Sequence, residues 1–161
     1  MGGQKMEKMI VIILIVLAVS VLLISGCEPK VKEGAWHKTN APPDEGAKWE
    51  AFGSTSDGSW FYDGTRITRP SKDVVRVWAK LVWSDKGRVD NVKEYGEKFR
   101  TLDYTLALIE IHCVDKTIRA LSQSAYSTNR DLLSSFDREN AFWNFMSPDS
   151  VMDHLRKAIC K

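Results

Sequence analysis

Residues Val74–Ser84 read VVRVWAKLVWS, and apolar side chains occupy every second position of this run. Because successive side chains of a strand point to opposite faces of a sheet, the pattern predicts an antiparallel strand with one buried face. The other face carries Arg76 and Lys80 with Trp78 between them, so we expect Trp78 to be covered by another element or to bind a partner. The buried face would carry Val75, Val77, Ala79, Leu81 and Trp83.

After this strand, polar turn signals separate further apolar runs. The run Asp103–Cys113 (DYTLALIEIHC) is hydrophobic on both faces, which predicts a central strand covered on one side by a helix. In the helix-like run before it, Gly96 weakens the helix by about 1 kcal/mol. We expect a turn at Asp85–Gly87, a short helix at Val89–Arg100 and the central strand at Asp103–Cys113. Two further strands would follow at Lys116–Ser127 and Asp131–Ser135.

Before the strand, two short runs predict a β-hairpin. Lys48–Phe52 and Ser59–Tyr62 flank the loop-forming residues Gly53–Gly58 (GSTSDG). Thr65–Arg69 is a weaker strand candidate that would stop at Pro70, because proline cannot donate to the hydrogen-bond ladder.

The C-terminal residues predict a helix. Ser147 suits the N-cap, Pro148 the first helical position and Asp149 the positive end of the helix dipole. Met146 and Val151 are spaced as a hydrophobic staple. The buried stripe would be Val151, Met152, Leu155, Ala158 and Ile159. Together these elements predict an α+β domain, an antiparallel sheet of about six strands with the C-terminal helix packed on one face.

The N-terminal residues have the layout of a secretory signal peptide. Lys5 and Lys8 precede the uncharged run MIVIILIVLAVSVLLI from Met9, and Ser25-Gly26-Cys27 follows it. An uncleaved membrane helix is the alternative, but such a run spans only about 24 Å of a hydrocarbon layer roughly 30 Å thick. The Ser-Gly-Cys ending resembles the lipobox of bacterial lipoproteins, in which the cysteine is lipidated and becomes the first residue.

This interpretation divides the chain into three parts. Residues 1–26 would be the signal peptide, residues 27–46 a flexible tether containing Pro29, Pro42 and Pro43, and residues 47–161 the folded domain. The full chain has a formal charge of +2 and no block of lysine or arginine, so the composition gives no electrostatic argument for nucleic-acid binding.

The three cysteines have different expected roles. Lipidation of Cys27 would leave Cys113 and Cys160 as a pair in a compartment that permits disulfides, so we expect a bridge, with two buried free thiols as the alternative. Cys160 falls off the buried stripe of a regular helix, so the bridge requires the helix to end near Ala158.

A zinc site is a rival interpretation because each of these cysteines has a histidine nearby. His112 and Cys113 are adjacent and would point to opposite faces of a strand. His154 and Cys160 are six residues apart and do not share a helix face. The usual ligand spacings are also missing, so we expect no metal and no cofactor.

No pattern of catalytic residues stands out in the sequence. It contains no nucleophile elbow, phosphate-binding glycine loop or HExxH motif. His112 is expected to be packed or hydrogen-bonded and His154 to lie at the solvent edge of its helix, while Asp57 and Asp63 have turn roles. We expect the protein not to be an enzyme.

Several spacings resemble the surface-adhesin protein E family of bacterial lipoproteins. They comprise Trp49, Tyr62-Asp63 before Ile67 and Arg69, Val77-Trp78, Glu110 to Cys113, Lys116, Arg119, Leu121-Ser122, Tyr126, Trp143, Ser147 to Ser150, and Cys160. The chain departs from the family pattern at His112, where an acidic residue is usual, and at Asn129-Arg130, where glycine is favoured. The resemblance implies an antiparallel sheet with a disulfide-tethered C-terminal helix, and binding of host extracellular-matrix or serum glycoproteins.

Two functions follow as expectations. The first is a lipid-anchored binding or adhesion module displayed outward, for which exposed aromatic residues would supply hot spots; the candidates are Trp60, Phe61, Tyr62 and Trp78, although most would pack inside. The second is a periplasm-facing lipoprotein with a structural or assembly role. Glu28 after the lipidated cysteine is compatible with the outer membrane of a Gram-negative bacterium in both cases.

Overall fold

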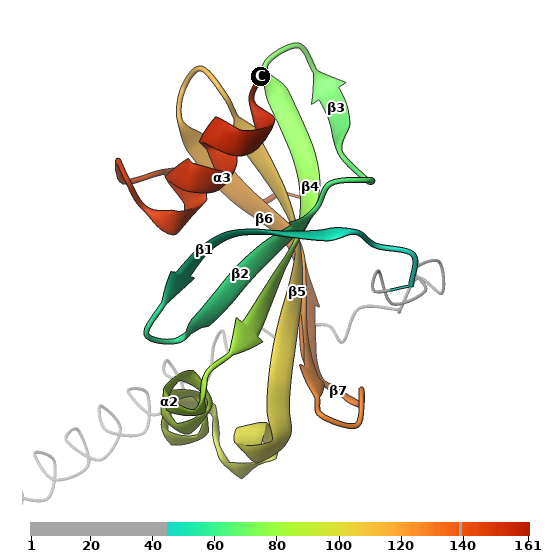
Figure 1. The fold of residues 1–161 in the computed structure, drawn as a ribbon, viewed down its shortest axis with the longest axis vertical. Coiled ribbons are helices and arrows are strands. Elements are labelled where there is room, and N and C mark those ends of the chain that lie inside the picture. The colour runs from blue at the N-terminus through green and yellow to red at the C-terminus, as the bar shows by residue number, and fades with distance from the viewer. Residues whose placement is uncertain (1–44, 139) are drawn as a thin grey trace, which may run out of the picture. The chain divides into compact units, whose positions relative to one another are not determined.

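The computed structural model describes residues 45–138 and 140–161, which form an α+β domain built on an eight-stranded antiparallel sheet (Figure 1). The predicted leader, the lipidation site Cys27 and nearly all of the predicted tether lie outside the described residues. The strands are β1 (Trp49–Thr55), β2 (Gly58–Asp63), β3 (Thr68–Ser71), β4 (Val74–Trp83), β5 (Leu102–His112), β6 (Thr117–Ser127), β7 (Leu132–Asp137) and β8 (Asn144–Phe145). The helices are α2 (Asp85–Tyr95), the 3₁₀ helix η1 (Glu97–Thr101) and α3 (Val151–Ile159).

Six strands form the continuous path of the sheet, in the order β1-β2-β4-β5-β6-β7. The two short strands pair at the ends of longer ones. β4 pairs with β2 along its second half and with β3 along its first half. In the same way, β6 pairs with β7 from Ser122 to Tyr126 and with β8 at Thr117 and Ile118. The predicted count of about six is therefore correct for the path, while β8 was not predicted.

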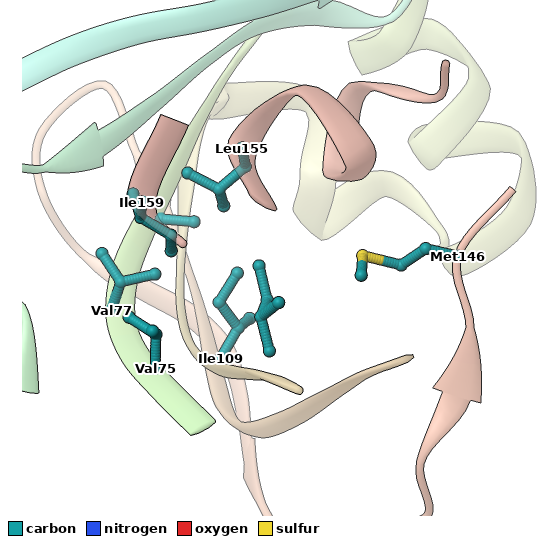
Figure 2. Packing of buried hydrophobic residues seen from close by; sticks show 8 residues of the cluster. Val75, Val77, Ile109, Met146, Leu155 and Ile159 are labelled. Atoms are coloured by element: carbon teal, nitrogen blue, oxygen red, sulfur yellow. The ribbon is translucent and has the colours of Figure 1, made fainter. Parts of the chain in front are cut away.

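The main core lies between the sheet and α3 (Figure 2). The apolar face predicted for β4 is confirmed, because Val75 and Val77 are fully buried. Leu155 of α3 is also fully buried and Ile159 is 5% exposed, so the helix packs through the stripe that the sequence predicts. The buried members of this core are Val75, Val77, Ala79, Ile109, Ile111, Met146, Leu155 and Ile159.

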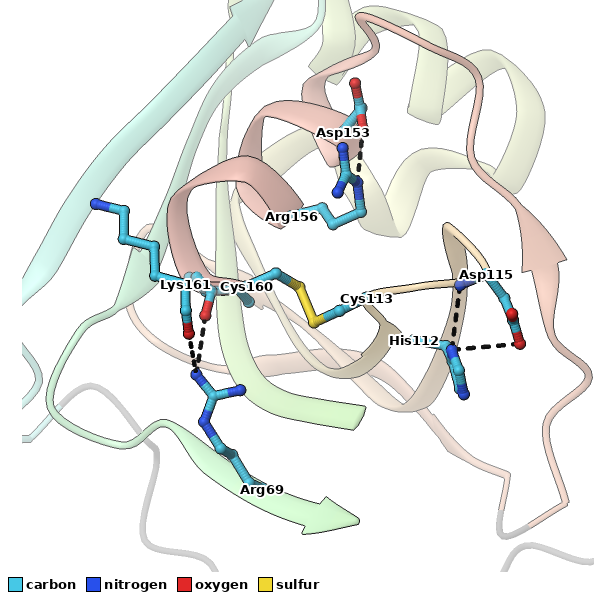
Figure 3. Close-up of a disulfide and its surroundings, with 9 residues drawn as sticks. Arg69, His112, Cys113, Asp115, Asp153, Arg156, Cys160 and Lys161 are labelled. Carbon is cyan, nitrogen blue, oxygen red and sulfur yellow. Dashed lines mark hydrogen bonds and ion pairs between the residues drawn. A yellow bond between two sulfur atoms is a disulfide. The ribbon is translucent and has the colours of Figure 1, made fainter. Parts of the chain in front are cut away.

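A disulfide between Cys113 and Cys160 fastens the end of α3 to the sheet (Figure 3). Their Cα atoms lie 5.7 Å apart, and the bridge joins residues 47 positions apart in the chain. The helix ends at Ile159 and Cys160 is its C-cap, as the bridge requires. The predicted disulfide is confirmed. Arg69 also donates to the carbonyl oxygens of Ile159 and Lys161, each at 3.3 Å.

A second, smaller core lies beneath η1 and the end of α2. Phe99 and Leu102 pack there against Ala125, with Trp83 at the margin. Since Trp83 and Ala125 lie on the same face of the sheet as Val77 and Ile109, α2, η1 and α3 all cover one face, as Figure 1 shows for α2 and α3. We call this the helix-covered face.

Two local predictions in the middle of the chain are wrong. Asp85–Gly87 is not a turn but the first turn of α2, because Ser84 is an N-cap whose Oγ accepts from the Gly87 N–H at 3.0 Å. Gly96 does not weaken a helix from inside. It lies just after α2 with a φ of 93°, a conformation that glycine adopts without steric cost, and it separates α2 from η1.

Three boundaries also differ from expectation. The N-cap of α3 is Ser150, not Ser147, because Ser147–Ser150 forms a turn in which the Ser150 N–H donates to the Ser147 carbonyl. This shift also removes the predicted staple, although Met146 is buried. Pro70 does not stop its strand but lies within β3, at an edge where the missing N–H costs little. The first hairpin is tighter than predicted, since only residues 56 and 57 separate β1 from β2.

The candidate binding face

The opposite face of the sheet carries no helix within the described part of the chain, and we call it the helix-free face. Strand pairing places Arg76, Glu110 and Arg119 in one row across β4, β5 and β6. A second row contains Lys80 of β4 and Phe61 of β2. Basic side chains therefore occupy both rows of this face, and Phe61 lies beside Lys80.

Lys80 is held between aromatic rings on this face. Its ammonium group lies 4.3 Å from the ring centroid of Tyr104 and 5.4 Å from that of Trp49. Tyr104 stacks in turn on Tyr126, with ring centroids 5.1 Å apart. Cation–π contacts of this kind stabilise by about 0.5–1 kcal/mol at exposed sites. The contacts fix the positions of these side chains relative to each other.

A three-membered charge cluster occupies the row on β4, β5 and β6. Glu110 is 1% exposed, and its Oε1 accepts from Arg76 Nε at 2.9 Å and Nη2 at 2.6 Å. Its Oε2 accepts from Arg119 Nε at 2.7 Å. Burial acts to raise the pKa of the Glu110 carboxyl, but the hydrogen bonds from the two guanidinium groups outweigh it and lower that pKa. Glu110 is therefore ionised at neutral pH, and the cluster has a net charge of +1.

Beside this cluster lies an exposed aromatic segment, Phe142–Phe145. Phe142 is 86% exposed, Phe145 75% and Trp143 37%. The ring of Trp143 lies over the Arg119 guanidinium at 4.5 Å and meets the ring of His112 edge-on at 6.0 Å. β8 pairs with β6 through Phe145 and Thr117, which places Phe145 on the helix-free face as well.

The four aromatic residues that were binding candidates in the sequence lie on two different faces of the sheet. Phe61 and Trp78 are half-buried on the helix-free face. Trp60 and Tyr62 lie on the helix-covered face, where their ring centroids are 6.2 Å and 6.1 Å from that of Phe52. All four residues are half-buried, and of these two Tyr62 also packs against the main core.

The titratable residues considered from the sequence have structural contacts. His112 Nδ1 lies 3.3 Å from the Asp115 carboxylate, and His154 is exposed on α3. Asp63 is fully buried and accepts from the Thr65 N–H, the Lys48 N–H and the Arg66 side chain. Its burial acts to raise the pKa, but these hydrogen bonds together lower it. Asp57 pairs with Lys86 at 3.0 Å.

Sequence reasoning missed the most distinctive parts of this face. Glu110 interrupts the apolar strand β5, and a carboxylate inside such a run signals buried cationic partners. Three of the four residues from 142 to 145 are aromatic, and their spacing fits neither the period of a strand nor that of a helix. Such a cluster could have indicated an exposed aromatic segment from the sequence alone.

A groove of about 300 Å³ lies between α2 and η1, lined by Arg88, Val89, Val92, Lys93 and Arg100. Its cations are each neutralised by a neighbouring acid: Arg88 by Asp85, Lys93 by Asp90 and Arg100 by Glu97. Among residues 45–138 and 140–161, no three potential metal ligands of the His, Cys, Asp or Glu type come together. No helix in that part of the chain is long and apolar enough to cross a membrane.

Comparison with known families agrees with this architecture. The family model for surface-adhesin protein E matches residues 49–161, which contain all eight described strands and the helices α2, η1 and α3. The chain belongs to the surface-adhesin protein E family. Membership in this adhesin family indicates an adhesion-type role, binding to host or other protein partners, and a location at the bacterial cell envelope or surface. A search of curated proteins found no match.

Proposed function

We propose that this member of the adhesin family is a lipoprotein of the outer membrane. Residues 1–26 are removed as a signal peptide, Cys27 carries the lipid, and residues 27–46 tether the domain formed by residues 47–161. The support is the basic start, the uncharged run and the Ser-Gly-Cys ending, together with membership in a family of surface adhesins. The membrane is then one partner, bound through Cys27, and an extracellular-matrix or other protein is the second.

The domain binds its protein partner through the aromatic segment Phe142–Phe145. The observation that carries this proposal is the exposure of Phe142 and Phe145, at 86% and 75%. Exposed aromatic side chains that lie close together are characteristic of interaction sites, because burying them against a partner removes apolar surface from water. Trp143 is already positioned by its stacking on Arg119, so it loses little freedom on binding.

Binding to a panel of coated extracellular-matrix glycoproteins tests this proposal. The double variant Phe142→Ser/Phe145→Ser should lose most of the binding, while Val89→Ser is a matched control because it also removes an exposed apolar side chain, 52% exposed on α2. Equal binding by both variants would refute the assignment of the surface.

Display toward the periplasm, with a structural role in the envelope, is the alternative for the same anchored domain. Mass spectrometry of the mature N-terminus establishes processing and lipidation at Cys27. Protease treatment of intact cells then separates the two orientations, because only an outward-facing domain is digested. Full protection of the domain on intact cells would exclude surface adhesion.

A further inference from the structure

We propose that Arg76 and Arg119 form a binding site for a carboxylate, supplied by an acidic side chain of the protein partner that contacts the aromatic segment. This inference rests on the proposed adhesive function and specifies the chemistry of the partner. The site lies at the end of the helix-free face where the charge cluster meets Trp143.

The hydrogen bonds of the cluster leave part of each guanidinium available. Glu110 binds one edge of Arg76 through Nε and Nη2, and one edge of Arg119 through Nε and Nη2. The remaining N–H donors of both groups have no other partner among the described residues. The side chain of Arg76 is 40% exposed and that of Arg119 28%. A carboxylate can accept two parallel hydrogen bonds from such an exposed guanidinium edge.

The charge balance distinguishes this cluster from the cations that line the groove beside α2. In that groove each cation is paired with a carboxylate, although Asp90, the partner of Lys93, also binds Lys86. At the cluster, two guanidinium groups share one carboxylate, which leaves one positive charge uncompensated. Asp115, in the turn after β5, lies 3.3 Å from His112, and no ion pair joins it to either guanidinium group. An incoming carboxylate therefore neutralises the cluster.

The surroundings favour an acidic protein segment over a sulfated polysaccharide. Polyanion recognition relies on an extended basic surface, whereas this chain has a formal charge of only +2 and the cluster offers a single excess charge. The neighbouring Trp143 and Phe145 offer apolar contact instead. The fitting ligand is a glutamate or aspartate flanked by apolar side chains.

Titration of the ¹⁵N-labelled full chain in detergent micelles tests the site directly. The probe is the peptide acetyl-Leu-Phe-Glu-Phe-Leu-amide, with its Gln counterpart as the control. The Glu peptide should shift the Nε–H signals of Arg76 and Arg119 and the indole signal of Trp143, and should bind about tenfold more tightly than the Gln peptide, as expected for a charge-assisted pair. Equal binding of the two peptides, or binding of heparin-derived oligosaccharide in preference to both, would overturn the proposal.

Variants of the cluster give effects of opposite sign. Arg76→Gln should weaken binding of the Glu peptide about tenfold, since it removes one of the two charge-assisted partners. Glu110→Gln should strengthen it, because the net charge of the cluster rises from +1 to +2. Arg100→Gln is the matched control, since it removes a guanidinium that is 75% exposed on η1. Thermal unfolding of each variant verifies the fold, and Arg76→Lys, which keeps the charge but loses the planar fork, should weaken binding in a folded protein.

Comparison with the aromatic variants separates the two proposals. One outcome is that the aromatic double variant loses matrix binding while Arg76→Gln and Arg76→Lys bind the Glu peptide as the unsubstituted protein does. That result would support the adhesive surface and refute the carboxylate site. If the aromatic double variant keeps matrix binding, and the Glu peptide still shifts the signals of Arg76 and Arg119, the result would refute the adhesive surface but not the carboxylate site.

Discussion

Replacing Cys113 and Cys160 by serine, singly and together, measures how much the disulfide stabilises the domain. The bridge closes a loop with a sequence separation of 47, for which chain entropy predicts a loss of about 4 kcal/mol when it is broken. For a domain of this size, that loss lowers the melting temperature by about 15 °C. Leu155 and Ile159 still bury α3 against the sheet, so we expect the reduced domain to stay folded at room temperature.

Urea unfolding followed by circular dichroism is the assay, because each free energy comes from one transition. Either single substitution breaks the same bridge, so both should destabilise by similar amounts and the double variant should lose little more. The unsubstituted chain with a reductant serves as the control and should unfold at the same urea concentration as the variants. Losses from the two single substitutions that add together would show that the residues act independently, and the argument from loop closure would then be wrong.

Three further predictions concern local contacts. Gly87→Ala should destabilise the domain although alanine favours helices, because a Cβ there would lie 2.3 Å from the Asp57 carbonyl oxygen; chemical unfolding measures the sign, and a gain in stability would contradict it. Ser150→Ala should cost about 1 kcal/mol through loss of the cap on α3, with Ser147→Ala as a near-neutral control in the same assay. The pKa of Glu110 is lower in the folded protein than its ordinary value of 4.5. The ionised Glu110 therefore contributes fully to folding stability above pH 4.5, and this contribution is lost as the pH falls through the lower folded pKa. Stability measured against pH should therefore fall less steeply below pH 4.5 in Glu110→Gln than in the unsubstituted protein.

The strongly periodic parts of the sequence were sufficient to predict the centre of the fold. The alternation along Val74–Ser84 identified β4 and its buried face. A shift of the strand pairing by one residue would turn Val75 and Val77 toward water, so the pattern allows only one face to be buried. The run Asp103–Cys113, apolar on both faces apart from a few polar residues such as Glu110, identified β5 as a strand between two others. The pairing of Cys113 with Cys160 followed from the cysteine count and the expected export.

Predictions from local sequence were wrong where contacts between distant parts of the chain decide which of several suitable residues takes a structural role. Both Ser147 and Ser150 can cap a helix, and the turn at Ser147–Ser150 selects the second. Gly87 was taken for a turn residue, but it is needed because the Asp57 carbonyl approaches the first turn of α2 closely. The charge cluster depends on Arg76, Glu110 and Arg119 facing one another across three strands, and strand register cannot be obtained from composition.

The edge position of β1 determines how the domain responds to mechanical load. Tension on the residues ahead of Lys48 enters the sheet at the first residue pair of its outermost strand, Trp49 with Asp63. The Lys48 N–H and carbonyl are bonded to the Asp63 side chain at 3.3 Å and the Gly64 N–H at 3.2 Å. Under the proposed anchoring through Cys27, the hydrogen bonds between Lys48 and the Asp63–Gly64 turn are therefore the first to bear a load on the tether.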